Sequence, residues 1–112
     1  MFKKEIVIDG KDHLKGRLCS YIAKQLLNGQ AVTVVRCELV NVSGSLFRNK
    51  LKYKDFRRKR TLTNPKKGPL HGRFPSFVVW RCVRGMVPHK TPRGANAMGK
   101  IFVVEICPNC YP

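Results

Sequence analysis

The sequence predicts a single α/β domain, because strand-like apolar runs alternate with a helix-like apolar pattern. A β-branched run at 5–9 is followed by an amphipathic pattern at 16–28, and a second β-branched run begins at 31. Strand, helix and strand in this order are typical of a parallel pair joined by a right-handed crossover. A further run at 101–105 supplies another buried strand. A chain of 112 residues is long enough for one domain and too short for two, so we expect a single domain over 1–112.

The first elements have clear boundaries. The strand at 5–9 ends in an Asp9–Gly10 turn, and the second is expected from Ala31 to Val35 and onward to Val42. Between them, apolar residues recur at spacings of three and four, and Gly29 lies where a left-handed helix cap is expected. The apolar residues of this predicted helix are Leu18, Cys19, Ile22, Ala23, Leu26 and Leu27.

The centre of the chain predicts a basic helix and a long loop. Residues 45–60 contain no Gly or Pro, and their length favours a helix, although 50–54 alternates like a strand. Residues 63–75 contain Asn64–Pro65 and Gly68–Pro69, which predict an extended, irregular loop. A loop this long within a compact domain usually has a function.

The segment 77–87 fits two structures. Its valines favour a strand by propensity, whereas Pro75 at a first helical position and the spacing of Val79, Val83 and Met86 favour a helix with these three side chains buried. Thr91 followed by Pro92 predicts an N-cap and a short helix ending at Met98.

The charge is large and unevenly distributed. The chain has 23 Lys and Arg against 6 Asp and Glu, a net charge of +17, and residues 48–100 hold sixteen of the basic residues with only Asp55 opposing them. Leu, Ile, Val and Phe make up 32 of 112 residues, about 29 %. A chain this charged is usually disordered only when these residues fall below roughly 20 %. A folded domain with this basic segment is typical of a nucleic-acid-binding protein. The predicted RNA-binding residues are Arg48, Lys50, Lys52, Lys54, Arg57, Arg58, Lys59, Arg60, Lys66, Lys67, His71, Arg73, Arg84, His89, Lys90 and Arg93.

Several classes of protein are not expected. No apolar run approaches the roughly 18 residues of a membrane span, and the N-terminus resembles no export signal, so a cytosolic or nuclear compartment is expected. Glycine-rich phosphate loops, paired carboxylates and nucleophile motifs are absent from the sequence, so we expect no catalytic residue, cofactor or small-molecule substrate. Cys107 and Cys110 have a zinc-like spacing without a second pair, so no metal site is expected and the five cysteines are interpreted as reduced thiols.

Three stretches together resemble one known family. They are GRLCSYIAKQLL at 16–27, NPKKGPLHGRFP at 64–75, and VRGMVPHKTPRG at 83–94. The chain resembles the large-subunit ribosomal protein L-thirteen family, in its eukaryotic and archaeal branch, over about residues 4–108. Family members continue beyond this length into C-terminal helices, which implies a chain shortened at its C-terminus.

The resemblance implies a three-layer α/β/α domain on a four-stranded, mostly parallel sheet, with a basic loop and helix as an extension. It implies a non-enzymatic structural role in the large ribosomal subunit, with ribosomal RNA and neighbouring large-subunit proteins as partners. Its location would be the cytoplasmic ribosome, with a nucleolar stage during assembly in a eukaryote. The alternative is a free RNA-binding regulator of translation acting outside the ribosome.

Overall fold

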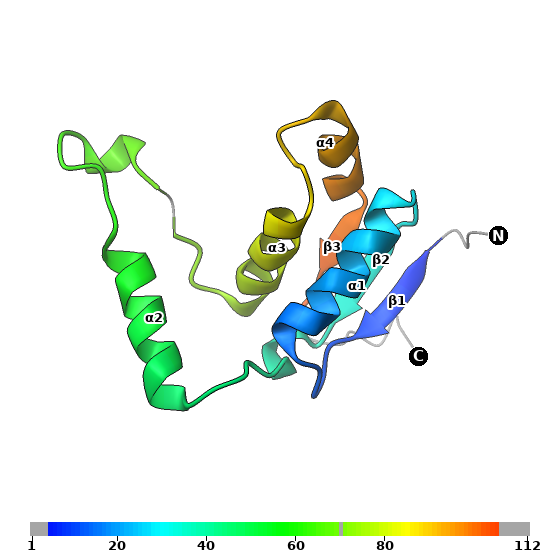
Figure 1. The fold of residues 1–112 in the computed structure, drawn as a ribbon, viewed down its shortest axis with the longest axis horizontal. Helices are drawn as coiled ribbons and strands as arrows, with labels where there is room; N and C mark the ends of the chain where they lie inside the picture. The colour runs from blue at the N-terminus through cyan, green and yellow to red at the C-terminus, as the bar shows by residue number, and fades with distance from the viewer. Residues whose placement is uncertain (1–4, 70, 106–112) are drawn as a thin grey trace.

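A computed structural model describes residues 5–69 and 71–105, which form a three-stranded parallel sheet with helices packed on it (Figure 1). The strands lie in the order β1-β2-β3, as they follow in the sequence. No helix in the described ranges is long and apolar enough to cross a membrane. The strands and α-helices are β1 (Ile6–Asp9), α1 (Lys15–Leu27), β2 (Val32–Val35), α2 (Leu46–Arg58), α3 (Pro75–Met86), α4 (Pro92–Met98) and β3 (Ile101–Val103).

The register of the sheet separates two faces. Ile6 lies beside Val32, which lies beside Ile101, and Val34 lies between Ile8 and Val103 in the same way. These six side chains are buried or half-buried on the face that carries the helices. In the intervening row, Val7 and Phe102 remain 45 % and 68 % exposed. The four-stranded arrangement is therefore not confirmed, since the described residues form three strands and none of their helices covers Val7 or Phe102.

Helix α1 confirms the predicted amphipathic segment. Its apolar stripe is buried against β2, α3 and α4, so one helix face contacts most of the body. The helix ends at Leu27, and Gly29 takes a φ of 96°, the left-handed conformation expected of a terminating glycine. The buried residues of α1 are Leu18, Cys19, Ile22, Ala23 and Leu26.

Strand β2 is shorter than the sequence indicates. The prediction that it continues to Val42 is wrong, because Arg36 takes a left-handed φ of 52° and a short 3-10 helix, η1 (Cys37–Leu39), follows. The side chain of Arg36 forms a two-point ion pair with Asp9 at the end of β1, with a distance of 2.9 Å from Nε to Oδ1. The β-branched residues beyond Val35 therefore leave the sheet, and Val42 is exposed.

Helices α3 and α4 resolve the ambiguous C-terminal half. The segment 75–86 is a helix and the strand alternative is wrong; Pro75 occupies the first turn, and Val79 and Val83 pack into the core. The hydroxyl of Thr91 accepts a hydrogen bond from the Gly94 amide at 3.3 Å, which confirms the predicted N-cap of α4. Strand β3 ends at Val103, two residues before the predicted end, and the Glu105 carboxylate accepts from the Ser76 amide at 3.4 Å and hydroxyl at 3.3 Å.

Helix α2 and the segment after it project from this body (Figure 1). The predicted basic helix is confirmed over 46–58, and none of its residues is buried. The predicted irregular loop is also found, interrupted by one 3-10 turn, η2 (Pro65–Lys67). The radius of gyration is 15.3 Å, against about 13 Å for a compact domain of this length. The projection therefore accounts for an extended shape on a small core.

Substitution of Leu26 tests the core. Leu26 is 1 % exposed, so we expect Leu26→Ala to lower the free energy of unfolding by about 2–5 kcal/mol, because apolar burial is reduced and a cavity is left behind. Leu46→Ala is the matched control, because Leu46 is 69 % exposed at the start of α2. Its effect should stay within about 0.5 kcal/mol in urea denaturation. Equal destabilisation of the two variants would contradict the assigned core.

Candidate nucleic-acid interface

Helix α2 presents its cations to solvent along its length. The hydroxyl of Ser45 accepts a hydrogen bond from the Arg48 amide at 3.3 Å and caps the N-terminus. Arg57 and Arg58 lie in the last turn, where positive charge is favourable to the helix dipole. All six predicted cations of this helix are exposed: Arg48, Lys50, Lys52, Lys54, Arg57 and Arg58.

One carboxylate lies within this basic surface. Asp55 accepts from Arg58 Nε at 2.6 Å and lies 3.9 Å from Lys59 Nζ. The Arg58 guanidinium holds the pKa of Asp55 below its usual range, with Lys59 adding to the effect. In the described part of the chain, Arg58 and Lys59 are the only two of the sixteen candidates with an acidic partner. The other cations on α2 therefore keep their full charge for an external anion.

Aromatic contacts hold α2 and the loop to the body. The ring of Phe56 meets the ring of His71 edge-on at 4.6 Å between centroids, and the guanidinium of Arg81 on α3 lies 4.1 Å from the Phe56 centroid. His71 Nε2 lies 2.8 Å from the carbonyl oxygen of Lys59. His71 is thus half-buried and ties the two ends of the loop together.

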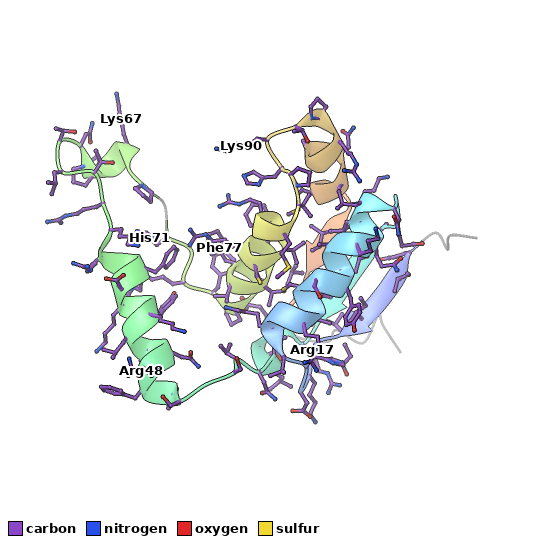
Figure 2. The ribbon with its side chains drawn as sticks, viewed as in Figure 1. Arg17, Arg48, Lys67, His71, Phe77 and Lys90 are labelled. Carbon is purple, nitrogen blue, oxygen red and sulfur yellow. The ribbon has the colours of Figure 1, made fainter. Side chains whose placement is uncertain are left out.

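The remaining loop cations are exposed and spread over the projecting part of the molecule. Figure 2 shows Arg48 and Lys67 at the two ends of this part, with Lys90 on the separate loop between α3 and α4. The exposed candidates of residues 59–73 are Lys59, Arg60, Lys66, Lys67 and Arg73.

The loop between α3 and α4 combines packing with charge. Arg84 is half-buried, with its guanidinium 5.2 Å from the Trp80 centroid, and its carbonyl oxygen lies 3.2 Å from Nδ1 of half-buried His89. Lys90 and Arg93 are exposed. The structure therefore places two of these four candidates at the surface and two partly beneath it.

The expected burial of Met86 is wrong. Met86 is 43 % exposed, and the core position falls to Val87, which is 4 % exposed. Val79, Val83 and Val87 follow one another at intervals of four, so Val87 continues the buried row even though the helix ends at Met86. The spacing of three residues from Val83 predicted burial of Met86, whereas the buried position is Val87, one residue later.

Two glycines of this region have opposite surroundings. A methyl group on Gly94 would lie 1.8 Å from the carbonyl oxygen of Pro88, so α4 approaches the preceding loop too closely for any side chain. A methyl group on Gly85 would meet nothing within 4 Å, so Gly85 does not serve close helix packing. The role of Gly94 was not predicted from the sequence.

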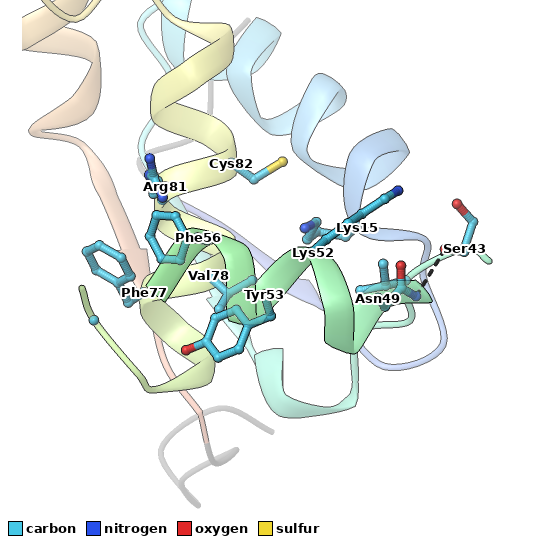
Figure 3. Close-up of a pocket in the computed structure, with 12 residues that line it drawn as sticks. Lys15, Ser43, Asn49, Lys52, Tyr53, Phe56, Phe77, Val78, Arg81 and Cys82 are labelled. Carbon is cyan, nitrogen blue, oxygen red and sulfur yellow. Dashed lines mark hydrogen bonds between the residues drawn. The ribbon is translucent and has the colours of Figure 1, made fainter. Parts of the chain in front are cut away.

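A cavity of about 560 Å³ separates α2 from α3 (Figure 3). Asn49, Tyr53 and Phe56 line it from α2, at the spacing of one helix face, and Arg81 and Cys82 line it from α3. Of its cations only Lys52 was predicted from the sequence, and Lys15 and Arg81 were missed. The spacing 49, 52, 53 and 56 was the available signal on α2.

Cys82 of the cavity lining interacts with Cys19 in the core, and the pKa values of the two thiols are shifted in opposite directions. Cys19 is fully buried, and the pKa of its thiol is raised by its hydrogen bond with Cys82 and by burial. The Cys19 thiol donates to the Val79 carbonyl oxygen at 3.8 Å. Its interaction with Cys82 and the nearby charge of Lys15 lower the pKa of Cys82 to about 6. Burial raises the pKa of Cys37 to about 11. Cys107 and Cys110 lie outside the described residues, among which no metal-binding cluster occurs.

Comparison with known proteins agrees with the resemblance found in the sequence. Residues 3–108 match the model of the family described as "Ribosomal protein L13". The chain belongs to the ribosomal protein L13 family. Three curated relatives, each named "Large ribosomal subunit protein uL13", are 53 % identical over 111 residues in Tetrahymena thermophila, 55 % over 108 in Spodoptera frugiperda and 57 % over 109 in Dictyostelium discoideum.

These alignments cover 99 %, 96 % and 97 % of the chain, and 56 %, 53 % and 58 % of the respective relatives. The chain therefore spans about half the length of the curated L13-family relatives it matches. The projecting α2 and loop, the cavity and the α3–α4 loop all lie inside the matched residues.

Paired glycine substitutions test the loop between α3 and α4. Gly94→Ala should lower the free energy of unfolding by about 1–3 kcal/mol, since the backbone must shift to admit the methyl group. Gly85→Ala should raise it by about 0.5–1 kcal/mol, because the added methyl meets no atom and reduces the freedom of the unfolded chain. Urea denaturation measures both. A stabilising Gly94→Ala would show that the close approach is absent.

The acidity of Cys82 predicts a pH-dependent reactivity. The thiolate is the nucleophile, so alkylation by iodoacetamide should rise with pH and level off above the pKa of about 6. Cys19 and Cys37 should stay unmodified while the chain is folded. Lys15→Met should move the midpoint upward, because it removes a nearby positive charge. Peptide mapping after timed alkylation identifies each residue, and a Cys82 midpoint near about 8.5, the ordinary thiol value, would contradict the assigned contact.

Proposed function

We propose that this chain is a structural component of the large ribosomal subunit that binds ribosomal RNA through its projecting basic surface. The observation that carries the proposal is the separation of charge from core. No side chain of α2 is buried. Together α2 and residues 59–73 expose eleven candidate cations, and Asp55 is the one carboxylate of this surface. The name shared by the curated relatives supports assignment of that surface to the large subunit.

Phosphate contacts supply most of the affinity in this proposal. Lys and Arg side chains that neutralise phosphates release bound counterions, which makes affinity fall as salt rises. The thirteen exposed candidates are suited to direct contact, and His71, Arg84 and His89 offer only the parts of their side chains left free by packing. The curated relatives are named as proteins of the large ribosomal subunit, which supports a structural role.

Partners and location follow from the same proposal. Ribosomal RNA would contact α2, the loop and the α3–α4 loop, and neighbouring large-subunit proteins would contact other surfaces. The site of action would be the cytoplasmic ribosome, reached through a nucleolar stage during assembly.

The four-stranded, three-layer architecture stays part of the proposal. Val7 and Phe102 support it, because they leave apolar surface on the sheet face opposite the helices. Parallel sheets are normally covered on both faces.

Removal of three arginines tests the basic surface. Arg57, Arg58 and Arg60 lie together at the end of α2. Their joint replacement by Ala should reduce the slope of log affinity for large-subunit ribosomal RNA against log salt by about 0.7–0.9 for each phosphate that the variant no longer neutralises. Arg58 should contribute least, because Asp55 already neutralises part of its charge. Filter binding over a range of salt concentrations measures the slope.

A charge-matched control separates this surface from the total charge. Lys11, Arg17 and Lys24 are exposed cations of the N-terminal segment. Their joint replacement by Ala removes the same charge and should leave the slope nearly unchanged. Equal slopes for the arginine variant and the unmodified chain would show that α2 does not contact the RNA. Tagged chain should also co-sediment with large subunits in magnesium, which a free regulator would not do.

A further inference from the structure

The cavity between α2 and α3 lies beside the contact between the Phe56 ring of α2 and the Arg81 guanidinium of α3. The α2 side is lined at helical spacing by Asn49, Tyr53 and Phe56, and the α3 side by Phe77 and Arg81. No α2 side chain is buried, so the cavity is not part of the core. We propose that this cavity is a binding site for one unstacked nucleotide of single-stranded RNA. The proposal rests on the RNA-binding function above and assigns a specific subsite to it.

The charge of the cavity fits the phosphate of a nucleotide. Lys15 of α1, Lys52 of α2 and Arg81 of α3 line it, and none of the described lining residues is acidic (Figure 3). The three cations come from three helices, so a phosphate at the cavity would connect parts of the fold that are otherwise far apart in sequence.

The aromatic residues of the cavity are not equally available for stacking. Phe56 already stacks against the Arg81 guanidinium at 4.1 Å and meets His71 at 4.6 Å. The backbone of Gly72 covers the Phe77 ring so closely that a methyl group on Gly72 would lie 2.3 Å from the ring. Tyr53 has only weak partners, Arg57 at 5.9 Å and Phe56 at 6.1 Å between centroids. The ring of Tyr53 is therefore the stacking surface that remains.

The form of RNA follows from these features. Bases stack on aromatic side chains where the RNA is unpaired, because a duplex keeps its bases stacked inside the helix. The volume of about 560 Å³ lies within the roughly 300–1,000 Å³ of sites for small molecules. The base would stack on Tyr53 while its phosphate lies near Lys15 and Lys52, so the site combines stacking with charge.

Substitution of Tyr53 tests the site with two RNA oligonucleotides, one with bases and one without. We expect Tyr53→Ala to weaken binding of a short single-stranded oligoadenylate about 5- to 100-fold, as measured by fluorescence anisotropy. Binding of an abasic strand of the same length should be the same for both proteins, because it has no base to stack. Phe47→Ala is the matched control: Phe47 is 70 % exposed on the same helix and lies outside the lining. It should bind both strands like the unmodified chain.

Alkylation of Cys82 provides a second measurement at the cavity itself. Saturating oligoadenylate should slow the reaction of Cys82 with iodoacetamide in the unmodified chain and in Phe47→Ala. Inorganic phosphate alone should not. Unchanged oligoadenylate affinity in Tyr53→Ala, or a Cys82 that reacts equally fast with and without oligoadenylate, would overturn the proposal. Equal protection by inorganic phosphate would do the same, because the site would then need no base.

The outcomes separate this subsite from the broader function. If the Arg57, Arg58 and Arg60 variant loses salt-dependent binding while Tyr53→Ala keeps its full affinity for oligoadenylate, the basic surface stands and the nucleotide site is wrong. If the unmodified chain binds neither ribosomal RNA nor oligoadenylate, both proposals are wrong. Tyr53 is not buried, so thermal unfolding of Tyr53→Ala should match that of Phe47→Ala and exclude a folding defect.

Discussion

Burial of one face of α1 against β2 and α3 is the interaction on which the other parts of the fold depend. Ile22, Leu26, Val34 and Val83 are each 1 % exposed or less and meet in this layer. Helix α3 leaves the layer in two directions, since its N-terminal end leads back to the loop and α2, and its C-terminal end leads to α4 (Figure 1). Disruption of the layer would therefore separate α2 and its loop from the loop between α3 and α4.

The distribution of charge lets a chain of net charge +17 keep this small core. Four of the six acidic residues lie in the first 47 positions, where Asp9 pairs with Arg36 and Glu5 accepts from Thr33. The excess of cations lies on α2 and the loop, where exposed side chains have high-dielectric solvent and salt around them. Repulsion is thereby greatest where few tertiary contacts have to resist it.

Sequence patterns within short segments correctly predicted the helices that are determined by those same segments. The apolar spacing of α1, the Thr91 cap and the absence of Gly and Pro in α2 identified three helices. Three other features depend on tertiary packing that no local pattern shows. They are the end of β2 before Arg36, which pairs with Asp9, the burial of Val87 in place of Met86, and the close approach of Gly94 to Pro88. The cavity was missed for the same reason, because Lys15, Tyr53 and Arg81 belong to separate helices. Charge counting identified the exposed cations and could not show that His71 and Arg84 are half-buried.

The absence of buried side chains on α2 has a consequence for the evolution of the family. Substitutions at sites without shared contacts change stability nearly additively, and exposed sites change it little. Residues of α2 can therefore be exchanged, and their charges moved along the helix, while the layer of α1, β2 and α3 remains intact. Phe56 is the exception on this helix, since Arg81 and His71 both depend on its ring. Under the proposed function, sequence drift on α2 would be limited by contact with RNA more than by the stability of the fold.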